Sequence, residues 1–378
     1  MRIAVPAETD ANEARVAATP ETVKKLIGLG ADVVVQAGAG TGSGITDADF
    51  EKAGAAIAAD AAATVAGADV VLAVRRPTSA SLAGVTHGAA VLAIMDPYGQ
   101  HDAVLDLAHA NIQAFAMELM PRITRAQVMD VLSSQANLAG YRAVLDAAAE
   151  YGRAIPMMMT AAGTVPAAKI FIMGVGVAGL QAIATARRLG GVVTATDVRP
   201  ATKEQVESLG AKFLAVEDEE FKQAQTAGGY AKEMSKEYQA KQAALTASHI
   251  AKQDIVVTTA LIPGRPAPKL ITADMVASMR PGSVIVDLAV ERGGNCELAR
   301  PGEVVVTDNH VKIVGHLNVA GRLAATASQL YAKNLFAFLE TLIDKESKAL
   351  KIDSEDELVK ATRLTADGAI VHPSFAAA

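Results

Sequence analysis

The segment Lys169–Asp197, KIFIMGVGVAGLQAIATARRLGGVVTATD, decides the fold because it places a glycine-rich turn between a strand pattern and a helix pattern. An apolar run, Ile170–Met173, leads into the turn, and the apolar helix pattern that follows stops at Gly190. A second run rich in β-branched residues then ends on Asp197. This order of strand, turn, helix and strand predicts one complete βαβ unit.

The spacing of the three glycines indicates a dinucleotide. Gly174 permits the tight turn, Gly176 lets the backbone approach a pyrophosphate, and Gly179 lets the helix pack closely on the strand. The N–H groups at the start of the helix then face the anion. Asp197 follows Gly176 by 21 residues, close to the spacing of about 20 at which a carboxylate meets the ribose hydroxyls of adenosine. Three glycines alone are a weak signal, but here strand, helix and acidic residue all fall in register.

Asp197 also indicates which dinucleotide is bound. A 2′-phosphate beside this carboxylate is a like-charge contact that costs roughly several kcal/mol, so NAD(H) is favoured over NADP(H). Arg199 lies two residues further on, and its guanidinium either accepts a phosphate or forms an ordinary surface ion pair. Within this unit we predict cofactor binding by Gly174, Gly176, Val177, Ala178, Gly179, Asp197, Val198 and Arg199.

Composition bounds the other possibilities. A chain of 378 residues exceeds what one hydrophobic core usually serves, so we expect two domains. Hydrophobic residues make up 51% and aromatic residues only 4%, which suits helices packed on parallel strands. The net charge of −6, without a basic run, argues against nucleic acid as a partner. The scattered histidines and the single Cys296 predict no metal site.

The amino terminus and the apolar segments predict a cytoplasmic protein without direct membrane insertion. The first residues, MRIAVPAETD, carry acidic side chains where a signal peptide needs its apolar core. The most membrane-like stretch, residues 170–186, is the strand and helix of the glycine unit. It contains three glycines and Gln181, and nothing else reaches about 18 uninterrupted apolar residues.

Along the chain, strand patterns alternate with helix patterns, which predicts α/β architecture with two doubly wound, Rossmann-like parallel sheets joined by long helices. We expect a first domain at 1–125 with about 325–378, a linking helix at 126–150, and the NAD(H)-binding domain at 151–324. Thr19 followed by Pro20 predicts a helix start. The sequence TAGGY, residues 226–230, predicts a mobile loop near 222–236.

A second segment carries an unusual polar stripe. Thr124 and Gln127 have the spacing of a capping box, which predicts a helix from Thr124 to about Tyr151. On this helix Gln127, Asp130, Ser133 or Ser134, and Asn137 share one face. Between Ala126 and Tyr141 the only charged residue is Asp130, whereas a solvated face of that length normally carries Lys or Glu. The stripe therefore indicates the lining of a cleft, with a domain interface or a solvated face as the alternatives.

Long runs of the sequence resemble the NAD(H)-binding component of proton-translocating nicotinamide nucleotide transhydrogenase. They include MELMPRITRAQVMDVLSSQANLAGYRAV, TDVRPATKEQVESLGAKF, TAGGYAKEM, TTALIPGRPAP and DLAVERGGN, and they cover nearly the whole chain. The resemblance implies a homodimer of two Rossmann-like domains with NAD(H) in the interdomain cleft. It also implies a separate NADP(H)-binding component and membrane-spanning subunits that couple hydride transfer to proton translocation. This chain would then be peripheral, at the cytoplasmic face of the inner membrane.

The same resemblance assigns roles to residues. It implies that Arg122, Gln127, Asp130 and Ser133 form the nicotinamide site, that Asp197 binds the adenosine ribose, and that Tyr230 lies on the loop closing over bound nucleotide. It also implies that Tyr230, Ala260 and Leu261 bind the cofactor. The enzyme class implied is the Si–Re-specific, proton-translocating transhydrogenase, active only with its partner subunits. Direct hydride transfer between two nicotinamides needs no protein nucleophile or general base, so the protein contributes orientation and exclusion of water.

Two alternatives remain from the sequence. The chain also resembles alanine dehydrogenase, and Arg15 and Arg75 lie where that family presents cationic substrate ligands. However, Asp96 stands where that family has its catalytic His, and Glu291 stands where it has an Asp. Imine chemistry requires a proton donor and acceptor, so these differences favour the transhydrogenase. The other alternative is a non-catalytic NAD(H) sensor that signals to a partner.

Overall fold

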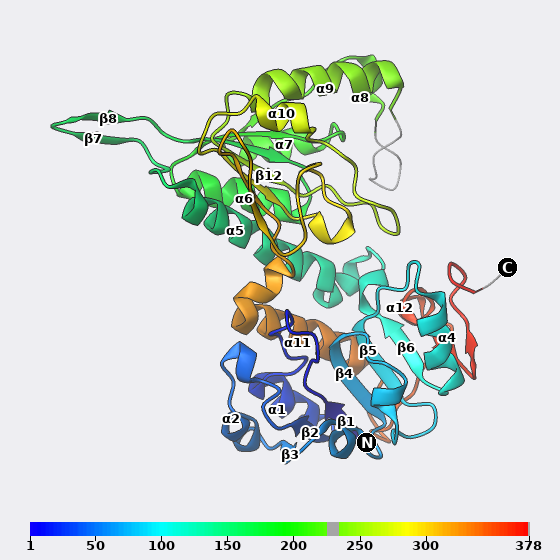
Figure 1. Ribbon diagram of the computed structural model, residues 1–378. Helices are drawn as coiled ribbons and strands as arrows, with labels where there is room; N and C mark the ends of the chain where they lie inside the picture. Colours follow the sequence, from blue (N-terminus) through cyan, green and yellow to red (C-terminus); the bar gives the residue numbers. More distant parts are fainter. Residues whose placement is uncertain (225–233, 377–378) are drawn as a thin grey trace. The chain divides into compact units, whose positions relative to one another are not determined.

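The computed structural model describes residues 1–224 and 234–376, and the chain divides into two compact units (Figure 1). The first unit consists of Met1–Gln135 and Ala320–Ala378, and the second consists of Ala136–Val319. The amino acids of the first unit are therefore drawn from both ends of the chain.

The first unit is built on a sheet of six parallel strands in the order β3-β2-β1-β4-β5-β6. From β1 the chain adds β2 and then β3 on one side, and it then crosses back to add β4, β5 and β6 on the other side of β1. This order is the doubly wound arrangement. The strands are β1 (Arg2–Val5), β2 (Asp32–Gln36), β3 (Ala56–Ala58), β4 (Val70–Arg75), β5 (Ala90–Ile94) and β6 (Gln113–Ala116).

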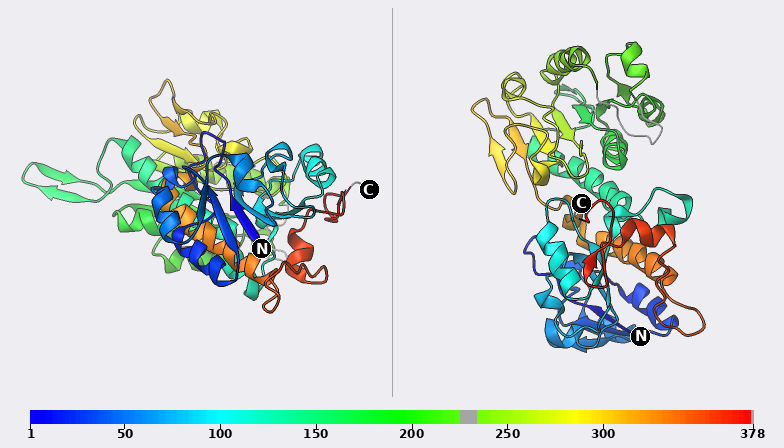
Figure 2. Two further views of the ribbon diagram at one scale, coloured as in Figure 1. Left: turned by 90° about the horizontal axis from the view of Figure 1, so that it is seen from below. Right: turned by 90° about the vertical axis from the view of Figure 1, so that its right-hand side faces the viewer.

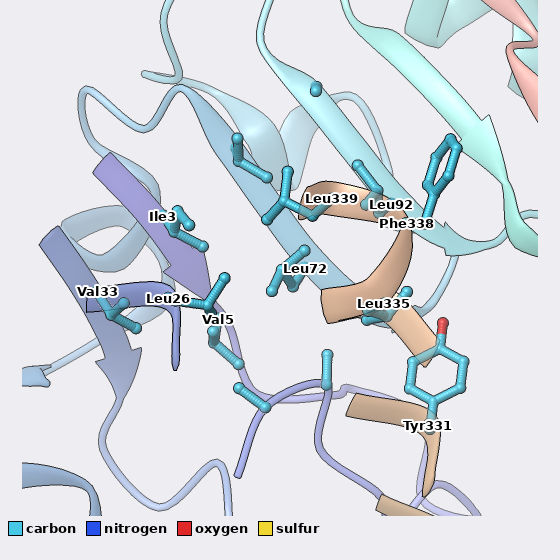
Figure 3. Close-up of a cluster of buried hydrophobic side chains, with 14 of the residues drawn as sticks. Ile3, Val5, Leu26, Val33, Leu72, Leu92, Tyr331, Leu335, Phe338 and Leu339 are labelled. Carbon is cyan, nitrogen blue, oxygen red and sulfur yellow. The ribbon is translucent and has the colours of Figure 1, made fainter. Parts of the chain in front are cut away.

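Helices cover both faces of this sheet because its central strands, β1, β4 and β5, are apolar on both sides. On one face Ile3 and Val5 pack with Tyr331 and Phe338, as Figure 3 shows. Ala4, between them on β1, belongs to the cluster on the opposite face. The helices of the unit are α1 (Pro20–Gly28), α2 (Asp47–Lys52), α3 (Ala61–Val65), α4 (His101–His109), α11 (Ala324–Thr341) and α12 (Glu357–Thr362).

Local signals explain where α1 begins. The Thr19 side chain accepts from the Thr22 N–H, the Thr22 hydroxyl oxygen accepts from the Thr19 N–H, and Pro20 occupies the first turn. This capping box satisfies two N–H groups that a helix end leaves without partners. The predicted helix start at Thr19 and Pro20 is confirmed.

The second unit is built on a sheet of seven strands in the order β11-β10-β9-β12-β13-β15-β14. All neighbours are parallel except β14 and β15, which are antiparallel. The strands are β9 (Lys169–Met173), β10 (Val192–Thr196), β11 (Lys212–Phe213), β12 (Ile255–Thr258), β13 (Val284–Asp287), β14 (Val304–Val306) and β15 (Lys312–Val314). The predicted α/β class with Rossmann-like doubly wound sheets is confirmed.

The central strand β9 shows why this sheet is covered on both faces. Ile170 and Ile172 join one buried cluster, while Phe171 and Met173 join the other. Such a strand reads as a continuous apolar run, as parallel strands do. The helices of the unit are the greater part of α5 (Val131–Tyr151), and α6 (Val177–Arg188), α7 (Thr202–Ser208), α8 (Glu219–Lys222), α9 (Lys236–Ile250) and α10 (Ala273–Ala277).

A hairpin that the sequence did not predict precedes β9. Its strands β7 (Met158–Thr160) and β8 (Gly163–Val165) pair only with each other. In Figures 1 and 2 the hairpin extends away from the body of the second unit, and the Met159 side chain is 79% exposed. Its run of three methionines gave no alternation from which a strand could be recognised. A second short hairpin, β16 (Thr365–Ala366) with β17 (Ala369–Ile370), lies in the first unit.

One half-buried carboxyl group makes the stability of the first unit depend on pH. Glu8 follows β1, and its carboxyl oxygens accept from the N–H groups of Val74 (2.6 Å) and Arg75 (3.2 Å) at the end of β4. Burial raises the pKa of Glu8 from 4.5 to about 7, although these two hydrogen bonds act in the opposite direction. The folded protein therefore holds the Glu8 proton to a higher pH than the unfolded chain does.

We predict that the Glu8 contribution to the free energy of unfolding is fully present below pH 4.5 and is lost as the pH rises through about 7. The loss amounts to roughly 3 kcal/mol. Urea unfolding at pH 5, 7 and 8 should show this decline in the wild type and a flatter profile in Glu8→Gln. Glu51→Gln, at an exposed acid, is the control and should follow the wild type; a parallel decline in Glu8→Gln contradicts the prediction.

Candidate dinucleotide site

The turn after β9 is held by a hydrogen bond to the segment after β12. Gly174 has a φ of +98°, which disfavours any residue with a side chain. A Cβ there would also lie 2.6 Å from Thr259 Oγ1. The Thr259 hydroxyl donates to the Gly174 carbonyl at 3.0 Å. The first glycine is therefore required by both its backbone conformation and this close neighbour.

Gly179 and Gly176 differ sharply in their surroundings. A Cβ on Gly179 would lie 1.9 Å from the Gly174 carbonyl oxygen, so only glycine allows α6 to approach the turn this closely. A Cβ on Gly176 would have no atom of the described residues within 4 Å, apart from its chain neighbours. Contacts within the protein thus require glycine at position 179 but not at position 176. The open side of Gly176 is where the protein backbone is expected to contact a ligand.

Helix α6 begins beside this open position. Gly176 is its N-cap and offers no side-chain hydrogen bond to the first turn. The first turn holds Val177, which is 38% exposed, and the half-buried Ala178. Unsatisfied N–H groups and the positive end of the helix dipole together favour an anion at such a terminus.

The end of β10 places Asp197 against the same turn. Asp197 Oδ2 accepts from the Val175 N–H at 2.7 Å. The Arg199 guanidinium binds the carboxylate through two nitrogens, Nε to Oδ1 and Nη2 to Oδ2, each at 2.9 Å. Val198, between them, is 40% exposed. Asp197 and the glycine turn are therefore brought together as the sequence predicts, and of the two alternatives for Arg199 the structure shows the ion pair.

Asn295, whose role the sequence patterns did not reveal, fixes the segment that follows β12. Asn295 is fully buried, and its amide makes paired hydrogen bonds with Ala260, accepting from its N–H at 3.0 Å and donating to its carbonyl at 2.9 Å. The same amide nitrogen donates to the Pro268 carbonyl. Leu261, next along, is 53% exposed. The only signal in the sequence was an asparagine after two glycines in DLAVERGGN, a pattern that indicates a turn rather than a clamp.

The predicted helix start at Thr124 is wrong. Thr124–Met129 forms the 3₁₀ helix η4, whose N-cap, Ile123, makes no side-chain hydrogen bond, and the long helix α5 begins only at Val131. Asp130 caps it instead: Oδ1 accepts from the Ser133 N–H at 2.8 Å and Oδ2 accepts from the Ser133 hydroxyl at 2.5 Å. The Asp130 carboxylate is a better cap than the Thr124 hydroxyl, because its negative charge also interacts favourably with the positive end of the helix dipole.

This correction divides the polar stripe. Asp130 and Ser133 are in direct contact, but Gln127 lies on η4 and not on the same helix. Arg122 and Gln127 are exposed, whereas Gln135 is buried and donates to the Ala327 carbonyl. Tyr230 lies outside the described residues. The lining of a cleft by this stripe stays a prediction.

Three comparisons with known proteins place the chain. Residues 4–139 match the family model "Alanine dehydrogenase/PNT, N-terminal domain" and residues 143–373 match "Alanine dehydrogenase/PNT, C-terminal domain". An NAD(P) transhydrogenase alpha subunit of Rhodospirillum rubrum is 58% identical over 99% of both chains. The crystal structure of transhydrogenase from Sinorhizobium meliloti is 64% identical, with a TM-score of 0.89, covering 98% of this chain and 100% of that one. Alanine dehydrogenase of Halomonas elongata is 30% identical over 100% of this chain and 96% of its own.

The chain belongs to the alanine dehydrogenase/PNT family. Within this family its likeness to the transhydrogenase subunit exceeds its likeness to the alanine dehydrogenase. The resemblance predicted from the sequence is confirmed.

Besides the pair of Asp197 with Arg199 in the second unit, a cluster of charged side chains lies in the first unit. Glu13 Oε2 accepts from Arg15 Nη2 at 2.6 Å and from Arg75 Nε at 2.8 Å. The side chains of Glu13 and Arg15 are 0% and 3% exposed, and Arg15 also donates to Gln135. The two arginines that suggested a small-acid site thus share a carboxylate of the protein itself.

Within residues 1–224 and 234–376, no helix is both long and apolar enough to cross a membrane. The same stretches of the chain hold no group of three His, Cys, Asp or Glu side chains that could bind a metal ion.

The contrast between Gly179 and Gly176 predicts that adding one methyl group destabilises the protein far more at Gly179 than at Gly176. Gly179→Ala should cost roughly 3 kcal/mol or more, because the Cβ clashes with a backbone carbonyl that cannot move freely. Gly176→Ala should cost less than about 1 kcal/mol, since its backbone is extended and its Cβ enters open space. Thermal unfolding of the two variants measures both, and equal losses contradict this geometry.

Proposed function

We propose that this chain is the NAD(H)-binding subunit of a proton-translocating nicotinamide nucleotide transhydrogenase. Direct hydride transfer would join NAD(H) bound here to NADP(H) on a partner component. The proposal rests on the glycine turn of the second unit, with its open Gly176 beside Asp197, in a chain related along its full length to a transhydrogenase alpha subunit.

The residues of the second unit fit the adenosine and pyrophosphate end of NAD(H). The first turn of α6 supplies N–H groups for the pyrophosphate at Gly176, Val177 and Ala178, and Asp197 supplies the carboxylate for the ribose. Ala260, held by Asn295, and the exposed Leu261 next to it supply a wall after β12. When bound, NAD(H) supplies the hydride donor or acceptor.

We assign the nicotinamide end to Arg122, Gln127, Asp130 and Ser133. Because the Ser133 hydroxyl donates to Asp130, its oxygen keeps lone pairs that accept from a carboxamide N–H₂ group. Gln127 is exposed and offers both a donor and an acceptor. Pairing of Arg122 with Asp130, and closure of the loop that carries Tyr230, complete this proposal.

The assembly follows from the same proposal. The chain would act as a homodimer, bind the NADP(H)-binding component, and stay peripheral at the cytoplasmic face of the inner membrane through membrane-spanning partner subunits. Those partners would couple the Si–Re-specific hydride transfer to proton translocation. The subunit name of the Rhodospirillum rubrum relative supports a multi-subunit enzyme.

The alanine dehydrogenase alternative is less well supported at the residues that it needs. Asp96 stands in place of the expected His, has a left-handed φ of 46°, and its N–H donates to the Glu118 carboxylate. Arg15 and Arg75 already share Glu13.

A mixing experiment tests the proposed function. The purified chain with an NADP(H)-binding transhydrogenase component should transfer hydride between NADH and an NADP analogue, and the chain alone should not. The chain alone should also fail to oxidise NADH with pyruvate and ammonia. Turnover with pyruvate supports alanine dehydrogenase, and NADH binding without either reaction supports the sensor.

The assigned role of Gln127 gives a separate prediction. Gln127→Ala should slow hydride transfer by roughly tenfold or more, because orientation of the reacting ring is lost, while NADH affinity changes little. Single-turnover transfer rates and calorimetric NADH binding separate the two effects. Thr124→Ala, on the same 3₁₀ helix, is the matched control and should retain both. Equal losses of rate and affinity in Gln127→Ala argue against an orienting role.

A further inference from the structure

The Asp197 carboxylate is fully occupied by hydrogen bonds from its own unit. Oδ1 accepts from the backbone N–H and Nε of Arg199, and Oδ2 accepts from the Val175 N–H and from Arg199 Nη2. A carboxylate has about four lone-pair sites, so these four donors saturate it. Its side chain is 7% exposed. A ribose diol can bind Asp197 only by replacing donors that are already present.

The donors differ in how readily they leave. Val175 N–H and Arg199 N–H belong to the backbone and fix the carboxylate where it is. The Arg199 guanidinium is at the end of a flexible side chain that is 27% exposed, and its other contact is the Val175 carbonyl at 3.1 Å. The guanidinium is therefore the group that ribose hydroxyls displace. Its two hydrogen bonds to the Asp197 carboxylate are replaced by two from the hydroxyls.

A 2′-phosphate meets the same pair differently. It has no hydrogens to offer the carboxylate at neutral pH, and its strongest partner is the guanidinium that Asp197 holds. Taking that guanidinium leaves a buried carboxylate without its cation and with two acceptor positions unfilled, whereas ribose hydroxyls fill those two positions, so the displacement costs more for the phosphate. Repulsion by Asp197 is thus only one component of the discrimination, and the remainder is competition for one arginine.

We propose that Arg199 is a specificity-determining residue, which yields the Asp197 carboxylate to the ribose diol of NAD(H) but is withheld by Asp197 from the 2′-phosphate of NADP(H). This inference rests on the proposed NAD(H) site. It adds that the chain already carries a phosphate ligand for NADP(H), which Asp197 keeps engaged.

The test measures the dissociation constants of NADH and NADPH by titration calorimetry in four proteins: wild type, Asp197→Asn, Arg199→Gln and the double variant. Asp197→Asn releases the guanidinium, so NADPH should bind about tenfold more tightly than to wild type, and NADH about tenfold more weakly. Adding Arg199→Gln should abolish the gain for NADPH. Arg199→Gln alone should keep or tighten NADH binding, because the competitor of the ribose is gone. It should leave the weak NADPH binding nearly unchanged, because Asp197 already withholds the guanidinium from the phosphate.

The outcomes distinguish the possible failures. If Arg199→Gln weakens the binding of both nucleotides by the same factor, the arginine acts only through its hydrogen bond to the Val175 carbonyl, and the inference is wrong. If the double variant binds NADPH as tightly as Asp197→Asn does, another group is the phosphate ligand, which also overturns it. Arg199→Lys combined with Asp197→Asn keeps the charge without the planar fork and should keep some of the gain. A folded wild type that binds no NADH refutes the proposed function itself.

Discussion

The second unit depends on how closely helix α6 approaches the turn that follows β9. The Gly179 α-carbon lies so near the Gly174 carbonyl that a side chain would place an atom 1.9 Å from the oxygen. This approach directs the first turn of α6 to the carboxyl end of the parallel sheet, where β10 delivers Asp197 and β12 delivers Thr259. A single methyl group at this contact would separate elements that otherwise share one surface.

The two units show how one topology supports different chemistry. Their sheets have the same strand order around the first strand, yet only the second unit carries the glycine turn. In the first unit the chain after β1 instead places Glu8 on backbone N–H groups of β4, followed by the ion pairs of Glu13 with Arg15 and Arg75. In the first unit, the carboxyl edge of the sheet is thus occupied by charged side chains of the protein itself. Fold alone would have assigned the two edges the same role.

The sequence was sufficient where the structure depends on local or periodic signals. The two strand runs of the glycine unit located β9 and β10, and Thr19 with Pro20 located the start of α1, because each pattern is read within a few residues. It failed at Thr124, where the capping spacing was present but Asp130 capped α5 instead. The role of Asn295 was also invisible, since Ala260 lies 35 positions away in the chain. The ion pair of Arg199 with Asp197 was one of two alternatives left open by the sequence, because two residues of spacing allow the contact but do not require it.

The discontinuity of the first unit has a consequence for the order of events during synthesis. Strands β1–β6 leave the ribosome first, but the face of their sheet that α11 covers must wait for residues 324–341, which follow the entire second unit. Until then Ile3, Val5 and Leu72 lack the partners Tyr331 and Phe338. The second unit, continuous in the chain, can complete its own core earlier. The glycine turn of the second unit is therefore expected to reach its final structure while the first unit still exposes apolar surface. Binding of chaperones would be favoured during that period.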